Sequence, residues 1–132
     1  MEKTLFFTGE NTGKVIIDYL PMVNYAMVPN NYKVFNSFVV INISSAPIEN
    51  INIRLSGDMF ESCSFDIEEL QCGNSASIAQ ANLIPSLQKL MALTEAIQTS
   101  FNITIKCKGK ILLNESLPLM LLPFNQWHGE NT

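Results

Sequence analysis

Three stretches of this chain alternate apolar and polar residues with a period of two, and this alternation constrains the fold more than any other feature. They cover residues 38–43, 51–56 and 101–108. Successive side chains of a β-strand point to opposite faces, so a period of two is typical of a sheet that packs one face against a core. The sequence therefore predicts an all-β domain in which two sheets pack as a sandwich.

The size and composition of the chain are typical of one folded domain. With 132 residues, of which 47% are hydrophobic and 15% charged, it can bury a substantial core. The net charge of −4 argues against a dedicated nucleic-acid-binding module, and no apolar run approaches the roughly 20 residues that cross a bilayer. Three cysteines, an odd number without a Cys-x-x-Cys pair, favour reduced thiols. We therefore expect a cytoplasmic protein without membrane contact.

Turn-forming residues indicate where strands begin and end in the N-terminal half. Pro21 interrupts an apolar run at 15–28, which predicts an edge strand that bends or changes partner at this proline. A short turn at 46–47 separates a central strand at 34–45 from the next strand at 48–56. These two strands are predicted to pair as an antiparallel hairpin.

The C-terminal half combines a predicted helix with a second hairpin. Apolar residues recur at spacings of three and four over 83–97, which predicts one helix near 86–97 that closes an open end of the core. The strands at 101–108 and 111–122 are predicted to pair with each other. Pro118, which cannot donate a ladder hydrogen bond, should lie at a sheet edge or in a bulge.

The predicted domain organisation has three parts. Residues 1–14 are mostly polar and are expected to form a flexible lead-in. Residues 15–124 are predicted to form an immunoglobulin-like or fibronectin-like β-sandwich of about seven strands with one helix, and a closed β-barrel is the alternative architecture. Residues 125–132 are interpreted as the boundary to a further domain.

None of the patterns expected of an active site, a metal site or a cofactor site is found in the sequence. The segment 9–14 lacks the spacing and the hydroxyl group of a phosphate-binding loop. The acidic residues within 58–69 lack the register of a calcium loop. A single histidine, His128, provides neither a set of imidazole ligands nor a matched nucleophile and base. We expect no catalytic residue, no metal ion and no cofactor.

Lys106, Lys108 and Lys110 form the only basic cluster, and they are predicted to share one face around the last hairpin. Three lysines can contact phosphates, but the aromatic residues on which nucleic-acid bases stack are missing between them. A solvent-facing strand is therefore the favoured interpretation. Weak, salt-dependent contact with nucleic acid is the alternative.

The C-terminal part of the chain resembles a known group of proteins. The resemblance is carried by Leu87-x-x-Leu90-x-x-Leu93-Thr94-Glu95, by the strand at 101–108, and by Leu121-Leu122-Pro123-Phe124-Asn125-Gln126-Trp127-His128-Gly129. This order is similar to the N-terminal region of very large bacterial helicase-like proteins. There, a β-rich lead domain precedes regions of unknown function, superfamily 1 helicase motifs and often a restriction-endonuclease-like segment. The resemblance covers roughly the C-terminal two thirds of the chain and includes no helicase or nuclease residue.

The resemblance implies a non-catalytic accessory domain that docks the downstream domains of its own parent chain, or another protein. It would then contact nucleic acid only through the parent. Trp127 and Gly129 would lie where this domain meets the next one, because an indole ring combines an apolar body with a polar edge. Alternatively, Trp127 folds back and fills the open end of this sandwich.

A secreted or cell-surface binding module, of the adhesin or carbohydrate-binding type, is the alternative function. A disulfide bond or an occupied glycosylation site would favour it. Three Asn-x-Ser/Thr sequons begin at Asn42, Asn102 and Asn114. Two of them lie inside predicted strands, and a chain rich in asparagine, serine and threonine contains a few by chance, so we expect them to have no function.

Overall fold

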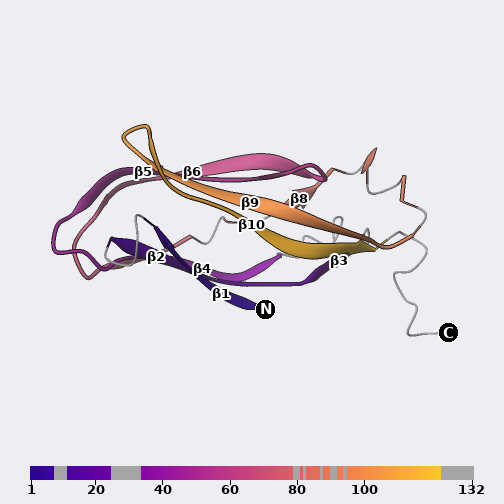
Figure 1. Ribbon diagram of the computed structural model, residues 1–132, viewed down its shortest axis with the longest axis horizontal. Helices are drawn as coiled ribbons and strands as arrows, with labels where there is room; N and C mark the ends of the chain where they lie inside the picture. Colours follow the sequence, from indigo (N-terminus) through magenta and orange to yellow (C-terminus); the bar gives the residue numbers. More distant parts are fainter. Residues whose placement is uncertain are drawn as a thin grey trace.

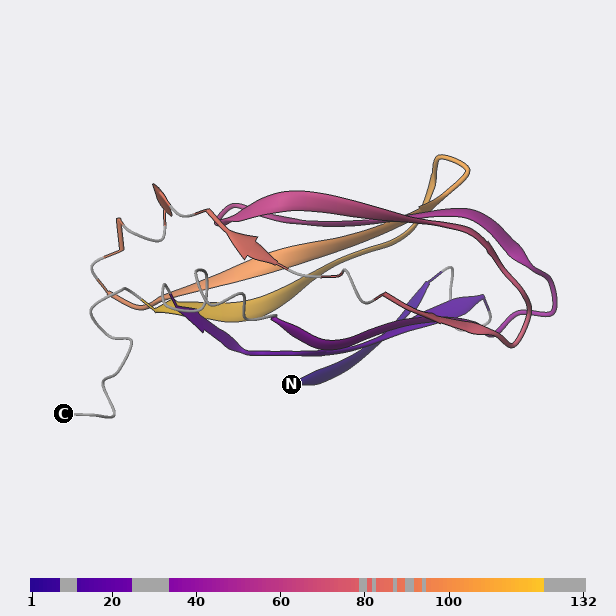
Figure 2. The ribbon, with the colours of Figure 1, turned by 180° about the vertical axis from the view of Figure 1, so that it is seen from behind.

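The described residues form ten β-strands in two sheets that face each other as two layers (Figure 1, Figure 2). The computed structural model describes residues 1–7, 12–24, 34–78, 81, 83–86, 88–89, 92–93 and 95–122. The predicted all-β fold is confirmed. Ten strands exceed the expected number because three of them, β3, β7 and β8, are only two or three residues long.

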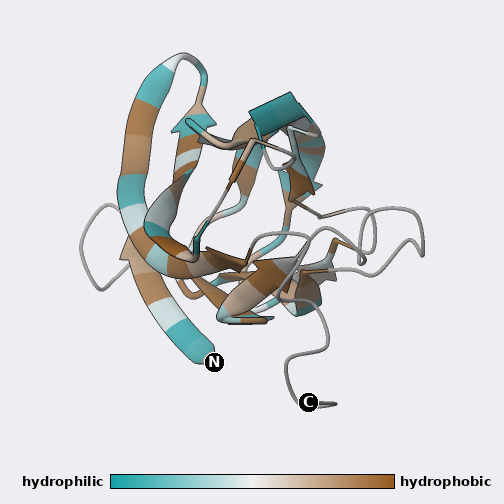
Figure 3. Cartoon of the chain, turned by 90° about the vertical axis from the view of Figure 1, so that its right-hand side faces the viewer, coloured by the Kyte–Doolittle hydropathy of each residue, from teal (hydrophilic) through white to brown (hydrophobic). Residues whose placement is uncertain are grey.

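The smaller sheet has four antiparallel strands in the order β1-β2-β4-β7. Their bounds are β1 (Glu2–Phe7), β2 (Gly13–Tyr19), β4 (Phe35–Asn42) and β7 (Ser75–Ser77). Burial alternates along β2, where every second side chain is buried. Figure 3 shows the matching alternation of apolar and polar segments along the strands.

The larger sheet has six strands in the order β3-β10-β9-β5-β6-β8. Their bounds are β3 (Met22–Asn24), β5 (Ile48–Gly57), β6 (Phe60–Leu70), β8 (Ile84–Pro85), β9 (Ile97–Cys107) and β10 (Lys110–Leu122). All pairs are antiparallel except β3 with β10. The predicted hairpin of β9 and β10 is confirmed. The predicted change of partner at Pro21 is also confirmed, because β2 belongs to the small sheet and β3 to the edge of the large one. The predicted edge position is wrong for β2, which lies between β1 and β4.

A cluster of aromatic side chains joins the two sheets in the core. The ring centroid of Phe101 on β9 lies 5.1 Å from that of Tyr19 on β2 and 5.6 Å from that of Phe35 on β4. Tyr19 is fully buried, and its hydroxyl group donates a hydrogen bond of 2.8 Å to the carbonyl oxygen of Pro118 on β10. The aromatic cluster therefore fixes the spacing of the layers by both packing and a polar contact.

The predicted hairpin of 34–45 with 48–56 is wrong, because β4 and β5 lie in different sheets. The chain crosses from the small to the large sheet over residues 43–47, and it returns between β6 and β7. Both strands are apolar on alternate positions, and this pattern does not specify which strand pairs with which. β5 pairs with β6 and β9 instead.

Both crossovers are tied to one buried polar side chain, that of Asn42 at the end of β4. Its Nδ2 group donates hydrogen bonds of 2.8 Å to the carbonyl oxygens of Ala46 and Leu70. Its Oδ1 atom accepts from the backbone N–H of Ser44 at 2.9 Å and from the Ser44 hydroxyl at 2.7 Å. Asn42 is 0% exposed, so the amide satisfies its hydrogen-bonding capacity entirely within the protein. This bonding also leaves the Asn42 amide no room to carry a glycan.

The N-terminal segment differs from the flexible lead-in predicted over 1–14. Residues 2–7 form β1, which pairs with β2 along its whole length, while residues 8–11 lie outside the described residues. Phe7 is fully buried in the core. The polar residues of β1, Glu2, Lys3 and Thr4, are exposed at the edge of the sheet, so the segment looks polar in the sequence although it belongs to the fold.

Replacing Gly13 with alanine is expected to lower the free energy of unfolding by about 1–3 kcal/mol. A Cβ atom at Gly13 would lie 2.1 Å from Cζ of the buried Phe7 ring, so the ring would have to leave its site. Thermal unfolding checks this expectation. Ser77→Ala, at an exposed position of the same sheet, serves as the control, and equal melting temperatures for the two variants would contradict the expectation.

The predicted helix near 86–97 is not confirmed as a whole: among the described residues of this range only 88–89 are helical, and β9 already begins at Ile97. The N–H of Ala92 donates to the carbonyl of Gln88 at 3.3 Å, which is the spacing of a helical hydrogen bond. Ile97 is the first residue of β9, and Leu83 is buried in the core just before β8. Several apolar residues of this segment therefore serve the core from strands and a connection. Residues 87, 90–91 and 94 lie outside the described residues.

Candidate functional site

The outward side of the large sheet carries small polar side chains and two cations. The inward residues of β5, Ile51, Ile53 and Leu55, are fully buried, so the residues between them point outward. Strand register extends this pattern across four strands. We call this surface the polar face, and it consists of Asn52, Arg54, Ser56, Ser62, Ser64, Asp66, Asn102, Thr104, Lys106, Ile111, Asn114 and Ser116.

The polar face is hollowed on both sides of Arg54. A shallow depression of about 340 Å³ is lined by Asn52, Arg54, Ser56, Thr104, Lys106, Ile111 and Asn114. A second depression of about 220 Å³ is lined by Asn52, Arg54, Ser62, Cys63 and Ser64. Arg54, the only arginine of the chain, therefore stands between two adjoining hollows.

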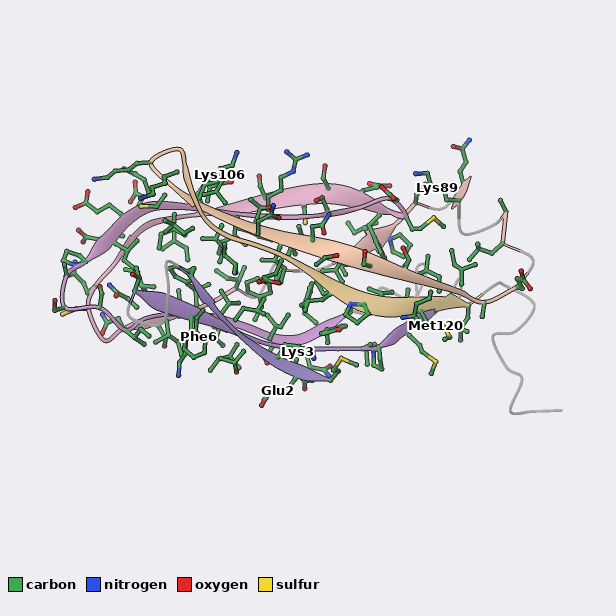
Figure 4. The ribbon with its side chains drawn as sticks, in the orientation of Figure 1. Glu2, Lys3, Phe6, Lys89, Lys106 and Met120 are labelled. Atoms are coloured by element: carbon green, nitrogen blue, oxygen red, sulfur yellow. The ribbon has the colours of Figure 1, made fainter. Side chains whose placement is uncertain are left out.

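Strand register places the two cations of the polar face close together. Arg54 lies opposite Ser64 on one side and Thr104 on the other, and Lys106 lies opposite Asn52. The two cations are thus diagonal neighbours, which corresponds to about 7–8 Å along the sheet. Figure 4 shows Lys106 on the large sheet, in the layer opposite to Lys3.

Within the part of the chain that the structure describes, neither Arg54 nor Lys106 forms a salt bridge. The acid on the polar face, Asp66, accepts a hydrogen bond of 2.9 Å from Nδ2 of Asn52. Serine and threonine hydroxyls beside the guanidinium group carry no charge. The centre of the polar face therefore carries two cations that have no ion-pair partner among the described residues.

The lysine cluster predicted from the sequence is not gathered on one face. Lys110 lies opposite Cys107 and Ile111 opposite Lys106, so Lys106 and Lys110 point to opposite sides of the sheet. Lys108 occupies the turn with a φ of 52° and is followed by Gly109 with a φ of 82°. Arg54 is the cation that accompanies Lys106. Arg54 and Lys106 are far apart in the sequence, so their proximity could not be predicted without knowing that β5 pairs with β9.

The described residues contain no group of three or more histidine, cysteine, aspartate and glutamate side chains that could hold a metal ion. No described helix is long and apolar enough to span a membrane. Trp127, His128 and Gly129 lie outside the described residues, and the predicted contact of Trp127 and Gly129 with a further domain stays a prediction.

Iodoacetamide is expected to alkylate Cys72 before the other two cysteines, none of which is disulfide-bonded. Cys72 is exposed, whereas burial raises the pKa of the Cys63 thiol and so lowers its fraction of reactive thiolate. The Cys107 thiol donates to the carbonyl of Glu49 at 2.9 Å. Peptide mapping after short labelling at neutral pH checks the order, and faster labelling of Cys63 would contradict it.

Comparison with known proteins gives no relative: no protein-family model matches the chain, and neither a curated protein nor a solved structure matches it.

Proposed function

We propose that this chain is a non-catalytic docking domain that binds a protein partner on the polar face. The observation that carries the proposal is the pair of hollows around Arg54, with Lys106 beside it and no acid partner for either cation among the described residues. The surface lies on four hydrogen-bonded strands above fully buried residues, so a partner meets a rigid platform.

The resemblance supports a further part of the proposal. On this ground we propose that the domain belongs to the N-terminal region of a very large bacterial helicase-like protein, where it would hold downstream domains of its parent chain or recruit another protein. In this proposal the sandwich is of the immunoglobulin-like or fibronectin-like type, and the protein is cytoplasmic. The unbridged cysteines are the form that a reducing compartment maintains.

Site-specific photocross-linking in the source cells tests the docking proposal. A photoreactive phenylalanine derivative replaces Asn114, an exposed residue that lines the larger hollow. The same substitution at Ser77, exposed on the opposite sheet, is the control. We expect adducts from position 114 that position 77 does not give. Equal or absent adducts at the two positions would overturn the docking proposal.

The native size of the protein tests the proposed parent. An immunoblot with an antibody to this domain is expected to detect a band far larger than the 14.8 kDa of this chain. A band of that small size would overturn the helicase-like parent and favour an independent binding module. The cross-linking result would stand in either case.

A further inference from the structure

We infer that the polar face binds an extended acidic peptide segment. Two carboxylates of the peptide, two residues apart in its sequence, bind one to Arg54 and the other to Lys106. This inference rests on the proposed docking function and specifies the chemistry of the partner.

Charge is distributed unevenly over the large sheet. The chain has eight lysine and arginine residues, and four of them, Arg54, Lys106, Lys108 and Lys110, lie on β5 or at the hairpin of β9 and β10. β6 carries four acids, Glu61, Asp66, Glu68 and Glu69, whereas β5 and β10 carry one each, Glu49 and Glu115. Lys110 points to the other side of the sheet, but the polar-face residues of β5, β9 and β10 include the cations Arg54 and Lys106 and no acid. A partner that covers these residues therefore meets a positive surface, although the whole chain carries −4. Charge complementarity requires an acidic partner.

The two cations have groups that suit carboxylates. Arg54 has five N–H donors in a planar fork that pairs with both oxygens of one carboxylate. Asp66 accepts a hydrogen bond from Asn52 and forms no salt bridge with Arg54 among the described residues, so the guanidinium group is open to a partner's carboxylate. Hydroxyl and amide groups of Thr104 and Asn114 line the same hollow and can hydrogen-bond the partner's backbone.

The spacing of the cations matches an extended chain. Alternate side chains of a strand point to the same side at intervals of about 6.6–6.8 Å, and the diagonal separation of Arg54 and Lys106 is about 7–8 Å. The larger hollow, about 340 Å³, is at the lower end of the range of ligand sites, roughly 300–1,000 Å³. It therefore fits a short segment with the pattern acidic-x-acidic.

Peptide is favoured over nucleic acid by two features of the same surface. The polar face has no aromatic residue on which a base could stack. Asp66 lies diagonal to Arg54 on β6, so a phosphate backbone that continues past Arg54 toward β6 is repelled, whereas a short peptide ends its charges on Arg54 and Lys106.

Fluorescence anisotropy with the whole chain tests the inference through three labelled peptides of equal length. They are Ser-Glu-Ser-Glu-Ser, its isomer Ser-Glu-Glu-Ser-Ser, and Ser-Gln-Ser-Gln-Ser. We expect the first peptide to bind best, the isomer more weakly and the glutamine peptide not at all. Binding should weaken as salt is raised from about 0.1 M to 1 M, because the Debye length falls from about 10 Å to 3 Å.

Variants locate the binding on the polar face. Arg54→Gln and Lys106→Gln are each expected to weaken binding of the first peptide about fivefold. Lys3→Gln, an equal loss of charge on the opposite sheet, should leave it unchanged. All three positions are exposed, so circular dichroism should show intact folding.

Three results would overturn the inference: equal binding of the acidic and glutamine peptides, equal effects of all three variants, or a short single-stranded DNA that displaces the peptide and binds more tightly. If the acidic peptide does not bind while cross-links from position 114 still form, the docking proposal stands and only the inference of an acidic partner is wrong. If position 114 also gives no specific cross-links, the proposed docking function is wrong as well.

Discussion

Replacing Asn42 with leucine is expected to lower the free energy of unfolding by about 3–5 kcal/mol, although the two side chains are similar in size. The substitution removes the donors to the carbonyl oxygens of Ala46 and Leu70 and the acceptor for Ser44. Each buried polar group left without a partner costs about 1–3 kcal/mol. Urea unfolding followed by circular dichroism measures the loss.

A matched control separates the buried network from the loss of any asparagine in β4. Asn36 lies on the same strand and is exposed, so Asn36→Leu should change the unfolding midpoint little. Asn42→Asp should destabilise strongly at neutral pH, because its carboxylate would face two carbonyl oxygens. If Asn42→Leu proved as stable as Asn36→Leu, the network would not be what holds the crossovers.

Replacing Tyr19 with alanine is expected to destabilise the protein by about 3–5 kcal/mol. The ring is fully buried against Phe101, so its removal leaves a cavity between the sheets. Tyr19→Phe keeps the ring and loses only the hydrogen bond to Pro118, for which we expect about 1–2 kcal/mol. Urea unfolding of both variants checks this order, and equal losses would show that packing contributes nothing.

Tyr19 also predicts a loss of stability in alkali. Burial raises the pKa of Tyr19 above its ordinary value of 10.0. The unfolded chain then releases this proton at lower pH than the folded protein does, so stability is complete below about pH 10 and falls as the pH rises toward the folded pKa. Between about pH 8 and pH 11, the unfolding midpoint should fall more steeply for the unsubstituted protein than for Tyr19→Phe. Parallel curves would contradict the assignment, since the other tyrosines are present in both proteins.

Local pattern predicted the strands well, because burial of one face imposes a period of two wherever a strand lies on the core. It could not choose the buried face of β4, since Val39 and Ile41 are as apolar as Phe38 and Val40, and only the second pair is buried. The role of Asn42 could not be predicted either, because an asparagine at the end of an apolar strand resembles an ordinary turn residue.

The candidate site was harder to predict than the fold, because it consists of residues from four strands. The lysines near the last turn were visible as neighbours in sequence, but alternation sends Lys106 and Lys110 to opposite sides. Arg54 came beside Lys106 only through the pairing of β5 with β9. Such long-range pairing depends on the packing of whole sheets, which local residues do not report.

The contact between Tyr19 and Pro118 joins residues 99 positions apart and sets the order of events during synthesis. All strands of the small sheet have left the ribosome once residue 77 has emerged, but β9 and β10, which cover its inner face, follow only with residues 97–122. Tyr19 therefore lacks its contacts with Phe101 and Pro118 until residue 118 has been released. Translation speed over this interval controls how long the nascent chain is open to aggregation.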